Sequence, residues 1–331
     1  MAVADTANPV TVIIVNFNGG DILLKTLAAL QHQTLQAQRV MVVDNLSTDA
    51  SIDNAARLFP QFEYIRLSEN TGFAAGNNYA IKRCTTELVA LLNPDAFPEP
   101  EWLAELVNAA YHYPQAASFG SCQLIDSQND MIDGVEDVCH ISGLVWRGGH
   151  GRPRSPRDGV AREIFSPCAA AALYRRDAVH DVGGFDEDFF CYVEDVDLGF
   201  RLRLMGWQSR YVPSAVVRHV GSATTGGAHS DFSVYHGHRN LIWMYVKNMP
   251  GVLLWWLLPL HVMMNLVSIL AFVFKGKGKT IGRAKLDALA GLPKVWRKRT
   301  MIQNSRNVSW LAVLNMLNRK LLPDKRHDEF A

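Results

Sequence analysis

The chain has 331 residues, of which 48% are apolar and 20% charged, and its formal net charge is +1. This composition is typical of a folded protein with a sizeable core and excludes an intrinsically disordered chain. Its five cysteines include no CxxC pair, which argues against a structural zinc site or a disulfide framework. The first residues lack the basic and apolar regions of a secretory signal, so we expect the body of the protein to stay in the cytoplasm.

Short β-branched runs alternate with helical patterns through the N-terminal part of the chain. The β-branched runs predict strands at 10–15, 39–43, 63–67 and 87–92. The patterns between them predict helices at 21–30, 48–59 and 74–84. This alternation indicates an α/β fold with a mostly parallel, doubly wound sheet. Ligands of such sheets bind beyond the carboxyl ends of the strands.

The pattern becomes irregular after residue 115. The stretch 146–159 is rich in glycine, proline and arginine, and we expect it to be a flexible flap or an insertion. A run of small residues at 165–176 predicts a further strand. Regular structure therefore returns before the acidic segment at 186–197.

Polar side chains follow the predicted strands at the rim where ligands bind. Asn16 and Asn18 follow the first strand, and Asp44 and Asn45 follow the second. Asp44 ends its strand and points into the crevice, where a carboxylate can accept a hydrogen bond from the imide N–H of uracil or thymine. A helix N-cap is the alternative, but that role suits Ser47 or Asp49 better.

Gly72 and Gly76 stand at the start of the third predicted helix, where backbone N–H groups can attract phosphate. A turn glycine before a helix is common, and the run is not a P-loop. Asn77 and Asn78 in the same helix would need polar partners if they faced the crevice. This helix start is therefore a candidate phosphate-binding element.

Asn93, Pro94 and Asp95 follow the fourth predicted strand. Pro94 stiffens the turn and delivers Asp95 just beyond a buried strand, where a carboxylate can bind Mg²⁺ together with phosphate oxygens. An Asx-turn that closes the strand is the alternative. His219 ends a later β-branched run; a lone histidine is more often structural, but imidazole can complete such a site, especially for Mn²⁺.

Three acids, Glu194, Asp195 and Asp197, lie close together near a predicted helix start. Acids in the first turn of a helix are favoured by its macrodipole, which explains Glu194 without any catalytic role. Asp195 points in a different direction because adjacent residues do not share a helix face. A carboxylate beside a metal-bound phosphate can deprotonate a hydroxyl, so we assign the role of general base to Asp195. Glu194 and Asp197 are expected to support it by pairing with Arg201 or capping the helix.

Taken in order, six stretches of the chain resemble glycosyltransferase family 2, which has the GT-A fold. They are VTVIIVNFNGG, VVDNLSTDAS, ENTGFAAGNN, LLNPDA, GGFDEDFFCYVEDVDLGFRLRLMGW and VVRHVGSAT. The resemblance implies inverting transfer of a sugar from a nucleotide sugar, with Asp44 reading the pyrimidine base and Asp195 acting as the base. It also implies that Asp95 and His219 bind a divalent metal, Mg²⁺ or Mn²⁺. Asn93 stands where the family's metal motif has its first acid, which leaves Asp95 as the principal carboxylate ligand.

The segment 235–250 is similar to that of a rhamnosyltransferase-like branch of the family. We expect dTDP-L-rhamnose as donor, with UDP-galactofuranose as an alternative, and a lipid-linked or cell-surface polysaccharide as acceptor. A nucleotide-sugar-binding membrane protein without turnover is the other class considered, and intact Asp95, Asp195 and His219 argue against it. The residues expected to contact the donor nucleotide are Asn16, Asn18, Asp44, Asn45, Gly72, Asn77, Asn93 and Arg239.

We expect residues 1–245 to form the GT-A domain, with a nucleotide-binding half at about 10–115 and an acceptor and catalytic half at 116–245. Residues 246–331 are expected to form a helical tail. The apolar stretch 252–274 is long enough to cross a bilayer, but polar residues and a proline interrupt it, and a buried core helix is an alternative. A monotopic or re-entrant segment is favoured, because a crossing would export the basic C-terminus. Basic helices would then lie on the anionic cytoplasmic leaflet of a bacterial inner membrane, and no nucleic-acid partner is expected.

Overall fold

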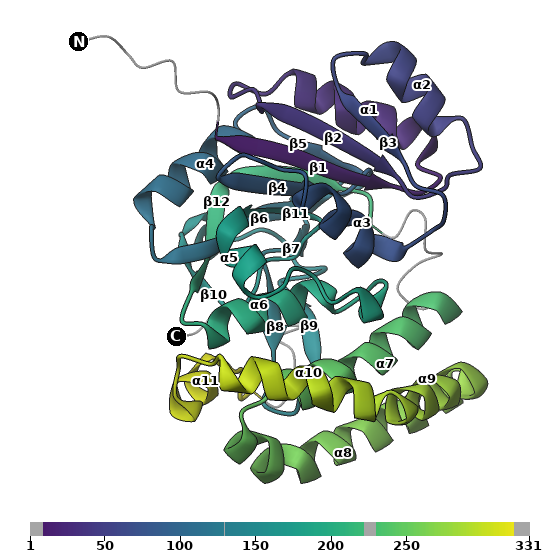
Figure 1. Cartoon of the computed structure of the whole chain (residues 1–331), viewed down its shortest axis with the longest axis vertical. Coiled ribbons are helices and arrows are strands. Elements are labelled where there is room, and N and C mark those ends of the chain that lie inside the picture. The colour runs from purple at the N-terminus through teal and green to yellow at the C-terminus, as the bar shows by residue number, and fades with distance from the viewer. Residues whose placement is uncertain (1–8, 129, 222–229, 321–331) are drawn as a thin grey trace.

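The structure is a computed structural model that describes residues 9–128, 130–221 and 230–320. A β-sheet crosses the body of the molecule and has helices on both faces (Figure 1). The C-terminal helices form a further layer beside this body.

The N-terminal half of the sheet has the parallel arrangement that the sequence predicts. β1 pairs in parallel with β2 and β4, and β2 pairs in parallel with β3. Strands β1 and β4 are buried along nearly their whole length, which explains their continuous apolar runs. The strands are β1 (Val10–Asn16), β2 (Arg39–Asp44), β3 (Glu63–Arg66) and β4 (Leu88–Leu92), and the helices between them are α1 (Gly20–Gln31), α2 (Ser51–Leu58) and α3 (Gly72–Ile81).

The other half of the sheet is mixed. Its strands are β5 (Ala96–Pro98), β6 (Ala116–Ile125), β7 (Ile132–Gly134), β10 (Arg162–Ile164), β11 (Ala171–Arg175) and β12 (Gln208–His219). β11, which confirms the strand of small residues, lies antiparallel between β4 and β6, and β12 runs parallel to β6. β5 and β10 pair antiparallel with β12, and β7 pairs antiparallel with β6. The main strand order is therefore β10-β12-β6-β11-β4-β1-β2-β3.

Residues 146–159 form hydrogen-bonded strand and turn structure. The sequence predicted a flexible flap or an insertion there. β8 (Glu136–Cys139) and β9 (Val145–Gly148) make a two-stranded hairpin below the main sheet in Figure 1. A short 3-10 helix, η1 (Pro156–Gly159), follows. Its Asp158 carboxylate accepts hydrogen bonds of 2.7 and 2.6 Å from Arg152. The stretch thus contributes a strand and a fixed turn to the body.

Two apolar cores hold the helices against the sheet. One face is covered by α1, α2 and α4 (Trp102–His112), and Leu23 and Trp102 are fully buried there. The other face is covered by α3, α5 (Arg176–Asp181) and α6 (Glu194–Leu204), with Leu198 in the second core. Covering both faces buries the apolar strands, so the polar residues gather at the strand ends.

The C-terminal helices share a third core with the body. Phe200 and Leu204 of α6 pack in one cluster with Tyr245, Leu253 and Val313 of the helical layer. The expected helical tail is therefore packed on the helix that carries the predicted base, and its division from the body at residue 245 stays a prediction. The helices are α7 (Asp231–Asn248), α8 (Gly251–Phe274), α9 (Gly278–Ala290), α10 (Leu292–Asn304) and α11 (Trp310–Met316).

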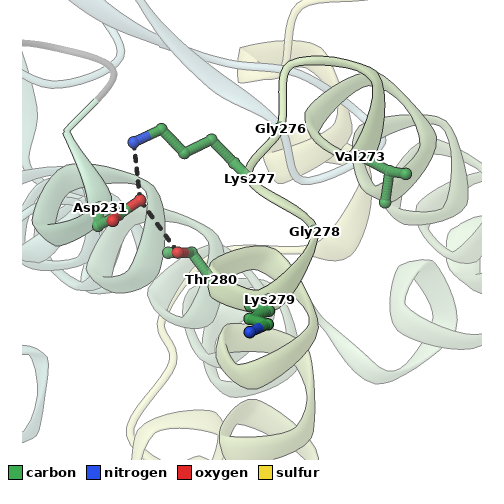
Figure 2. Close-up of a pocket in the computed structure, with 7 residues that line it drawn as sticks. All are labelled: Asp231, Val273, Gly276, Lys277, Gly278, Lys279 and Thr280. Atoms are coloured by element: carbon green, nitrogen blue, oxygen red, sulfur yellow. Dashed lines mark hydrogen bonds and ion pairs between the residues drawn. The ribbon is translucent and has the colours of Figure 1, made fainter.

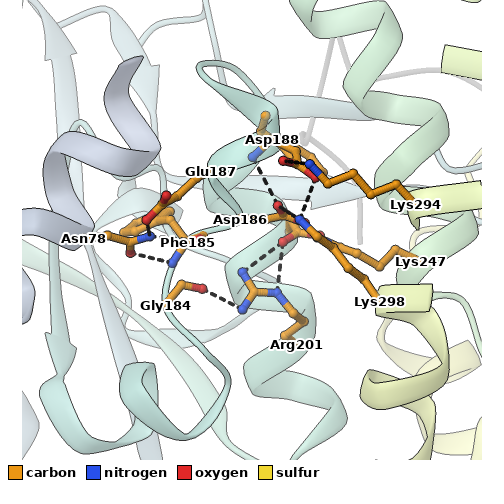
Figure 3. Close-up of polar contacts among 12 residues, drawn as sticks. Asn78, Gly184, Phe185, Asp186, Glu187, Asp188, Arg201, Lys247, Lys294 and Lys298 are labelled. Carbon is orange, nitrogen blue, oxygen red and sulfur yellow. Dashed lines mark hydrogen bonds and ion pairs between the residues drawn. The ribbon is translucent and has the colours of Figure 1, made fainter. Parts of the chain in front are cut away.

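Ion pairs reinforce the contact between the helical layer and the segment before α6 (Figure 3). Lys247 of α7 is buried and bonds to Asp186 and, at 2.8 Å, to Asp197. Lys298 of α10 bonds to Asp186 and, at 2.7 Å, to Asp188. Burial alone would raise the pKa of Asp186, but Lys247 and Lys298 outweigh it and hold that pKa well below its usual range.

Replacing Lys247 with methionine is expected to lower the free energy of unfolding by about 3 kcal/mol, because it leaves Asp186 and Asp197 short of a counter-ion. Lys294→Met is the matched control. Lys294 also bonds to an acid of this segment, Asp188, but its side chain is 65% exposed, and we expect a loss below about 1 kcal/mol. Urea unfolding followed by circular dichroism measures both variants. Equal losses of stability in the two variants would contradict the larger contribution of the buried Lys247 ion pairs.

Candidate active site

Asp44 and Asn16 lie side by side at the carboxyl ends of β2 and β1, where the register places them opposite each other. Both are buried, and Asn16 Nδ2 donates to Asp44 Oδ1 at 3.1 Å and to Ser51 Oγ at 3.0 Å. Asn16 Oδ1 is buried without a hydrogen-bond partner among the described residues. The sheet therefore brings two of the expected donor-binding residues together. One of them, Asn16, has a side-chain oxygen that is free, within the described structure, to accept a hydrogen bond.

Asn18 and Asn45 have partners in the neighbouring loops. Asn18 Oδ1 accepts a hydrogen bond of 2.8 Å from the Thr48 N–H. Asn45 Nδ2 donates to Asn70 Oδ1 at 2.9 Å, and Asn45 Oδ1 accepts from the Thr71 N–H at 2.9 Å. These bonds fix the loops around the rim of the sheet. A contact of either asparagine with a donor stays a prediction.

The start of α3 is packed against the segment before α6. Gly72 has a φ of +80°, and a Cβ atom there would lie 2.5 Å from the Phe190 carbonyl oxygen. The same carbonyl accepts a hydrogen bond of 3.2 Å from the Ala74 N–H. Asn77 is buried and donates to the Phe73 carbonyl at 2.9 Å, so its polar partner lies in its own helix. Glycine at position 72 thus permits a close approach that any larger residue would obstruct.

The pairing of β5 with β12 brings Asp95 and His219 together, because Ala96 lies opposite His219. Asp95 Oδ1 is 3.2 Å from His219 Nε2, and both residues are buried. This Nε2 has no hydrogen-bond partner in the part of the chain that the structure describes. Asn93 lies in the same turn, where its N–H donates to the Ala170 carbonyl at 2.8 Å. A carboxylate oxygen facing an unsatisfied imidazole nitrogen fits a divalent cation that is also bound by phosphate.

Asp133, in β7, holds the imidazole in place. Its Oδ2 lies 2.8 Å from His219 Nδ1 and 2.5 Å from Arg147 Nη1. Burial opposes ionisation of Asp133, but its basic neighbours, Arg147 foremost, keep the pKa of the carboxyl well below its usual range. Burial likewise would lower the pKa of His219, but Asp133 and Asp95 raise it to about 8. With Nδ1 bonded to Asp133, the ring presents Nε2 to Asp95.

Sequence patterns did not point to Asp133 or Arg147 as site residues. Both lie in the irregular stretch after residue 115, on different strands. They meet because Gly134 has no side chain: a Cβ atom there would lie 2.4 Å from Arg147 Cδ. The only local signal is the Asp-Gly pair at 133–134, which a turn would explain equally well.

Asp195 follows a strained segment. Phe190, Tyr192 and Val193 have φ angles of 64°, 69° and 70°, a region that is costly for residues with a Cβ and most of all for valine. Asn240 of α7 is fully buried, and its Nδ2 lies 2.8 to 3.0 Å from three carbonyl oxygens of this segment. The helical layer therefore holds the strained segment and, through it, the start of α6.

Asp195 is partly exposed, whereas the other acids at the start of α6 are buried. Asp195 Oδ2 accepts a hydrogen bond of 3.2 Å from the Ala169 N–H. Asp197 is fully buried and pairs with Arg201 at 2.9 Å. Burial and the charge of Asp195 raise the pKa of Glu194 well above its usual value. Among these three acids, Asp195 is therefore the one open to a substrate.

Arg239 makes its contacts within the protein. Its Nη2 donates to the carbonyl groups of Asp188 and Phe189 at 2.9 and 3.0 Å, and its Nε donates to Asn240 Oδ1 at 2.9 Å. The guanidinium also lies 4.3 Å from the centre of the Trp243 ring. These contacts place Arg239 beside the strained segment, and its expected contact with the donor nucleotide stays a prediction.

The family model described as Glycosyl transferase family 2 matches residues 11–183, just over half of the chain. Among known proteins, the N-acetylglucosaminyl-diphospho-decaprenol L-rhamnosyltransferase of Mycobacterium tuberculosis (strain ATCC 25618 / H37Rv) is 29% identical over 277 residues. This alignment covers 76% of the present chain and 87% of the relative. The similarity thus extends beyond the residues that the family model matches.

Two solved structures show a similar fold. One is GalNAc-T7 with UDP, GalNAc and Mn²⁺, with a TM-score of 0.59 and 13% identity over 73% of this chain and 48% of that one. The other is the mannosyltransferase PcManGT from Pyrobaculum calidifontis with GDP-Man and Mn²⁺, with a TM-score of 0.52 and 18% identity over 94% of this chain and 87% of that one. At these identities the similarity concerns the fold, and it confirms the expected GT-A fold.

Replacing Gly72 with alanine is expected to lower the free energy of unfolding by about 1 to 3 kcal/mol, since the new Cβ meets Phe190 at a positive φ. Gly237→Ala is the matched control. A Cβ on Gly237, within α7, meets no atom within 4 Å, so we expect stabilisation by about 0.5 to 1 kcal/mol. Thermal and urea unfolding of both variants measure the difference. An unchanged free energy of unfolding in Gly72→Ala would show that Phe190 can move away from the new Cβ without loss of stability.

Proposed function

The chain belongs to glycosyl transferase family 2 and is a glycosyltransferase, and from this premise we propose that it is an inverting, metal-assisted enzyme. Its proposed reaction transfers L-rhamnose from dTDP-L-rhamnose to a hydroxyl of a lipid-linked or cell-surface polysaccharide. The observation that carries the proposal is the convergence of Asp95 Oδ1 and His219 Nε2 at 3.2 Å. The rhamnosyltransferase of Mycobacterium tuberculosis, named for an N-acetylglucosaminyl-diphospho-decaprenol acceptor, supports the choice of sugar and of a lipid-linked acceptor.

Two other functions are alternatives to this proposal. A family 2 enzyme that uses UDP-galactofuranose would keep the same chemistry with another donor. A nucleotide-sugar-binding membrane protein without turnover would keep only the donor site. The presence of Asp95, Asp195 and His219 favours an active enzyme over the second alternative.

The donor nucleotide is proposed to bind at the rim formed by β1, β2 and β4. Asp44 would accept a hydrogen bond from the imide N–H of the base, and the unsatisfied Asn16 Oδ1 adds a second acceptor beside it. Asn93 follows β4 at the same rim, where the diphosphate would bind. The Gly72 N–H at the start of α3 donates to Asn70 Oδ1 at 3.0 Å, so Gly72 would shape this rim through its close contact with Phe190. Asn18, Asn45, Asn77 and Arg239 would contribute mainly by fixing the loops and helices around this rim.

Asp95 and His219 are proposed to hold Mg²⁺ or Mn²⁺, and both structural neighbours contain Mn²⁺ together with a nucleotide. A cation bound there would neutralise charge on the departing diphosphate. Asp133 keeps the His219 ring in one orientation through the 2.8 Å contact with Nδ1. That contact leaves Nε2 as the ligand atom, which would give up its proton when a cation binds.

Asp195 is proposed to accept the proton of the acceptor hydroxyl. The hydroxyl oxygen forms a bond to the anomeric carbon while the bond from that carbon to the diphosphate breaks, so the configuration inverts in one displacement. The proton moves to a carboxylate oxygen of Asp195. Partial exposure of Asp195 supports this role, because the neighbouring Glu194 and Asp197 are buried.

The test of the proposed function is a panel of nucleotide sugars incubated with the purified chain, Mg²⁺ or Mn²⁺ and a lipid-linked acceptor extract. We expect metal-dependent release of dTDP from dTDP-L-rhamnose above all other donors. Asp195→Asn is expected to keep nucleotide affinity and to lower kcat at least about 100-fold. Full turnover in this variant would remove Asp195 as the base. Donor binding without release from any donor would favour the binding protein.

Helix α8 is proposed to bind the protein to an anionic membrane. Among the described residues it is the only helix long and apolar enough to cross a bilayer, with a mean hydropathy of 2.1. Its outer face is apolar and exposed, and further exposed apolar side chains lie on α9, α10 and α11. Those on α8 are Val252, Trp255, Trp256, Val262, Met263, Leu266, Val267, Leu270, Val273 and Phe274.

The inner face of α8 is polar in its middle, which favours a helix that lies in the membrane plane over one that crosses. His261 Nδ1 lies 2.7 Å from the Ser142 carbonyl oxygen. Asn265 Oδ1 accepts a hydrogen bond of 2.6 Å from Lys285 of α9. A crossing α8 would have to break these bonds and place the polar groups in hydrocarbon.

The turn after α8 carries the basic sequence KGKGK and faces a pocket of about 490 Å³ (Figure 2). Within it Lys277 Nζ and Thr280 Oγ1 bond to Asp231 at 2.8 and 3.0 Å. The pocket includes none of the expected site residues, so we assign it no part in catalysis. Lysines beside an apolar helix favour the cytoplasmic leaflet, where each contributes about 1 kcal/mol of attraction to anionic lipid.

Joint replacement of Trp255 and Trp256 by alanine is expected to weaken binding to vesicles that contain anionic lipid by about tenfold or more, because both rings are exposed and apolar. Tyr111→Ala on α4 is the control, since Tyr111 is as exposed but lies on the body. Vesicle flotation of the full chain measures binding. Equal retention of the wild-type chain and the double variant would contradict α8 as the membrane-binding face.

A further inference from the structure

Asp137 lies next to the proposed base although it is distant from it in the sequence. It belongs to β8, opposite Arg147 in β9. Potential ligand atoms of Asp137, Cys168 and Asp195 all lie within 4.8 Å of one another. The Asp137 side chain is buried, and its Oδ2 has no hydrogen-bond partner in the described part of the chain. A buried carboxyl oxygen therefore lies beside Asp195 without a partner of its own.

The charges around this cluster do not balance if every acid is ionised. Arg147 is the cation beside the cluster, and its Nη1 is already committed to Asp133 at 2.5 Å. Its Nη2 donates to Cys168 Sγ at 3.1 Å, and burial raises the pKa of that thiol, which therefore stays neutral. Two adjacent carboxylates that share so little positive charge retain one proton between them.

The more buried of the two acids is the one that keeps the proton. Burial, and then the negative charge of Asp195, raise the pKa of Asp137 well above its usual value. Arg147 opposes this shift, while Glu136 adds to it. The structure therefore places a neutral carboxyl, which can donate a hydrogen bond, beside the partly exposed Asp195.

We propose that Asp137 is a positioning residue for the base: its protonated carboxyl donates a hydrogen bond to Asp195 and fixes the orientation in which Asp195 meets the acceptor hydroxyl. This inference rests on the proposed function of Asp195. The N–H groups of Ala169 and Val196 hold Asp195 Oδ2 and Oδ1 at 3.2 and 2.8 Å, and Asp137 supplies a further restraint on the same carboxylate from another strand. During transfer the acceptor proton moves to Asp195, and Asp137 keeps its own.

An alternative interpretation of the same cluster is a cation site, because it combines two carboxylates with a thiol. The guanidinium of Arg147 occupies its edge and already donates to Cys168. A bound cation would stand beside this fixed positive charge, and the thiol would have to lose its proton. The neutral form of Asp137 accounts for the cluster without any added ion.

Three variants, assayed as full chains with the donor and acceptor of the turnover assay, test the inference. Asp137→Asn keeps the shape of a neutral carboxyl and can still donate a hydrogen bond, so we expect kcat within about threefold of wild type. Asp137→Ala removes the donor, and we expect kcat to fall about 10-fold to 100-fold with the affinity for the nucleotide sugar unchanged. Asp195→Asn is expected to lose turnover in the same assay.

The pattern across the variants separates the inference from the proposed function. An Asp137→Asn variant as inactive as Asp195→Asn, with donor affinity intact, would show that Asp137 works as an ionised group. An Asp137→Ala variant with wild-type kcat would show that Asp195 needs no restraint from Asp137. In both cases an inactive Asp195→Asn would leave the proposed base in place, whereas an active Asp195→Asn would remove both. Nucleotide affinity and melting temperature of each variant identify any that has failed to fold.

Discussion

The Asp133 carboxylate is bound at the same oxygen by His219 at 2.8 Å and by Arg147 at 2.5 Å, and the arrangement of the candidate active site depends on this contact. The hydrogen bond between Asp133 and His219 orients the imidazole so that Nε2 faces Asp95. The ion pair between Asp133 and Arg147 holds the Arg147 guanidinium beside the cluster that contains Asp195. A single buried acid thus links the proposed metal ligands to the proposed base through fixed, charge-assisted hydrogen bonds.

The helical layer stabilises the second half of the site. Asn240 of α7 holds the strained segment before α6 through three carbonyl groups, and Lys247 pairs with acids on either side of that segment. Positive φ angles at Tyr192 and Val193 persist because these contacts compensate for their cost. Since α8 belongs to the same layer, the proposed membrane-binding face and the proposed base are parts of one packed unit. This arrangement suits an acceptor that is itself attached to a lipid.

The parallel half of the sheet could be predicted because its strands are short, β-branched and separated by helices of clear periodicity. The rim residues Asn16 and Asp44 followed from the same pattern. In the mixed half the strand of small residues could be predicted, but its antiparallel position between β4 and β6 could not, because it depends on long-range pairing that no local sequence feature encodes. The stretch 146–159 looked like a flap because its glycines and prolines break periodicity, yet part of it pairs with β8 and carries Arg147.

The amino-acid sequence by itself determined the fold class, the family and the identity of Asp95, Asp195 and His219 as candidates, because order and spacing along the chain carry that information. Only the tertiary structure decided which side chains surround them. Asp133 and Asp137 lie far along the chain from His219 and Asp195, and they reach them through the pairing of β7 with β6 and of β8 with β9. Burial and charge in those neighbourhoods then decide which acid keeps its proton, and these depend on the packed structure and not on residue type.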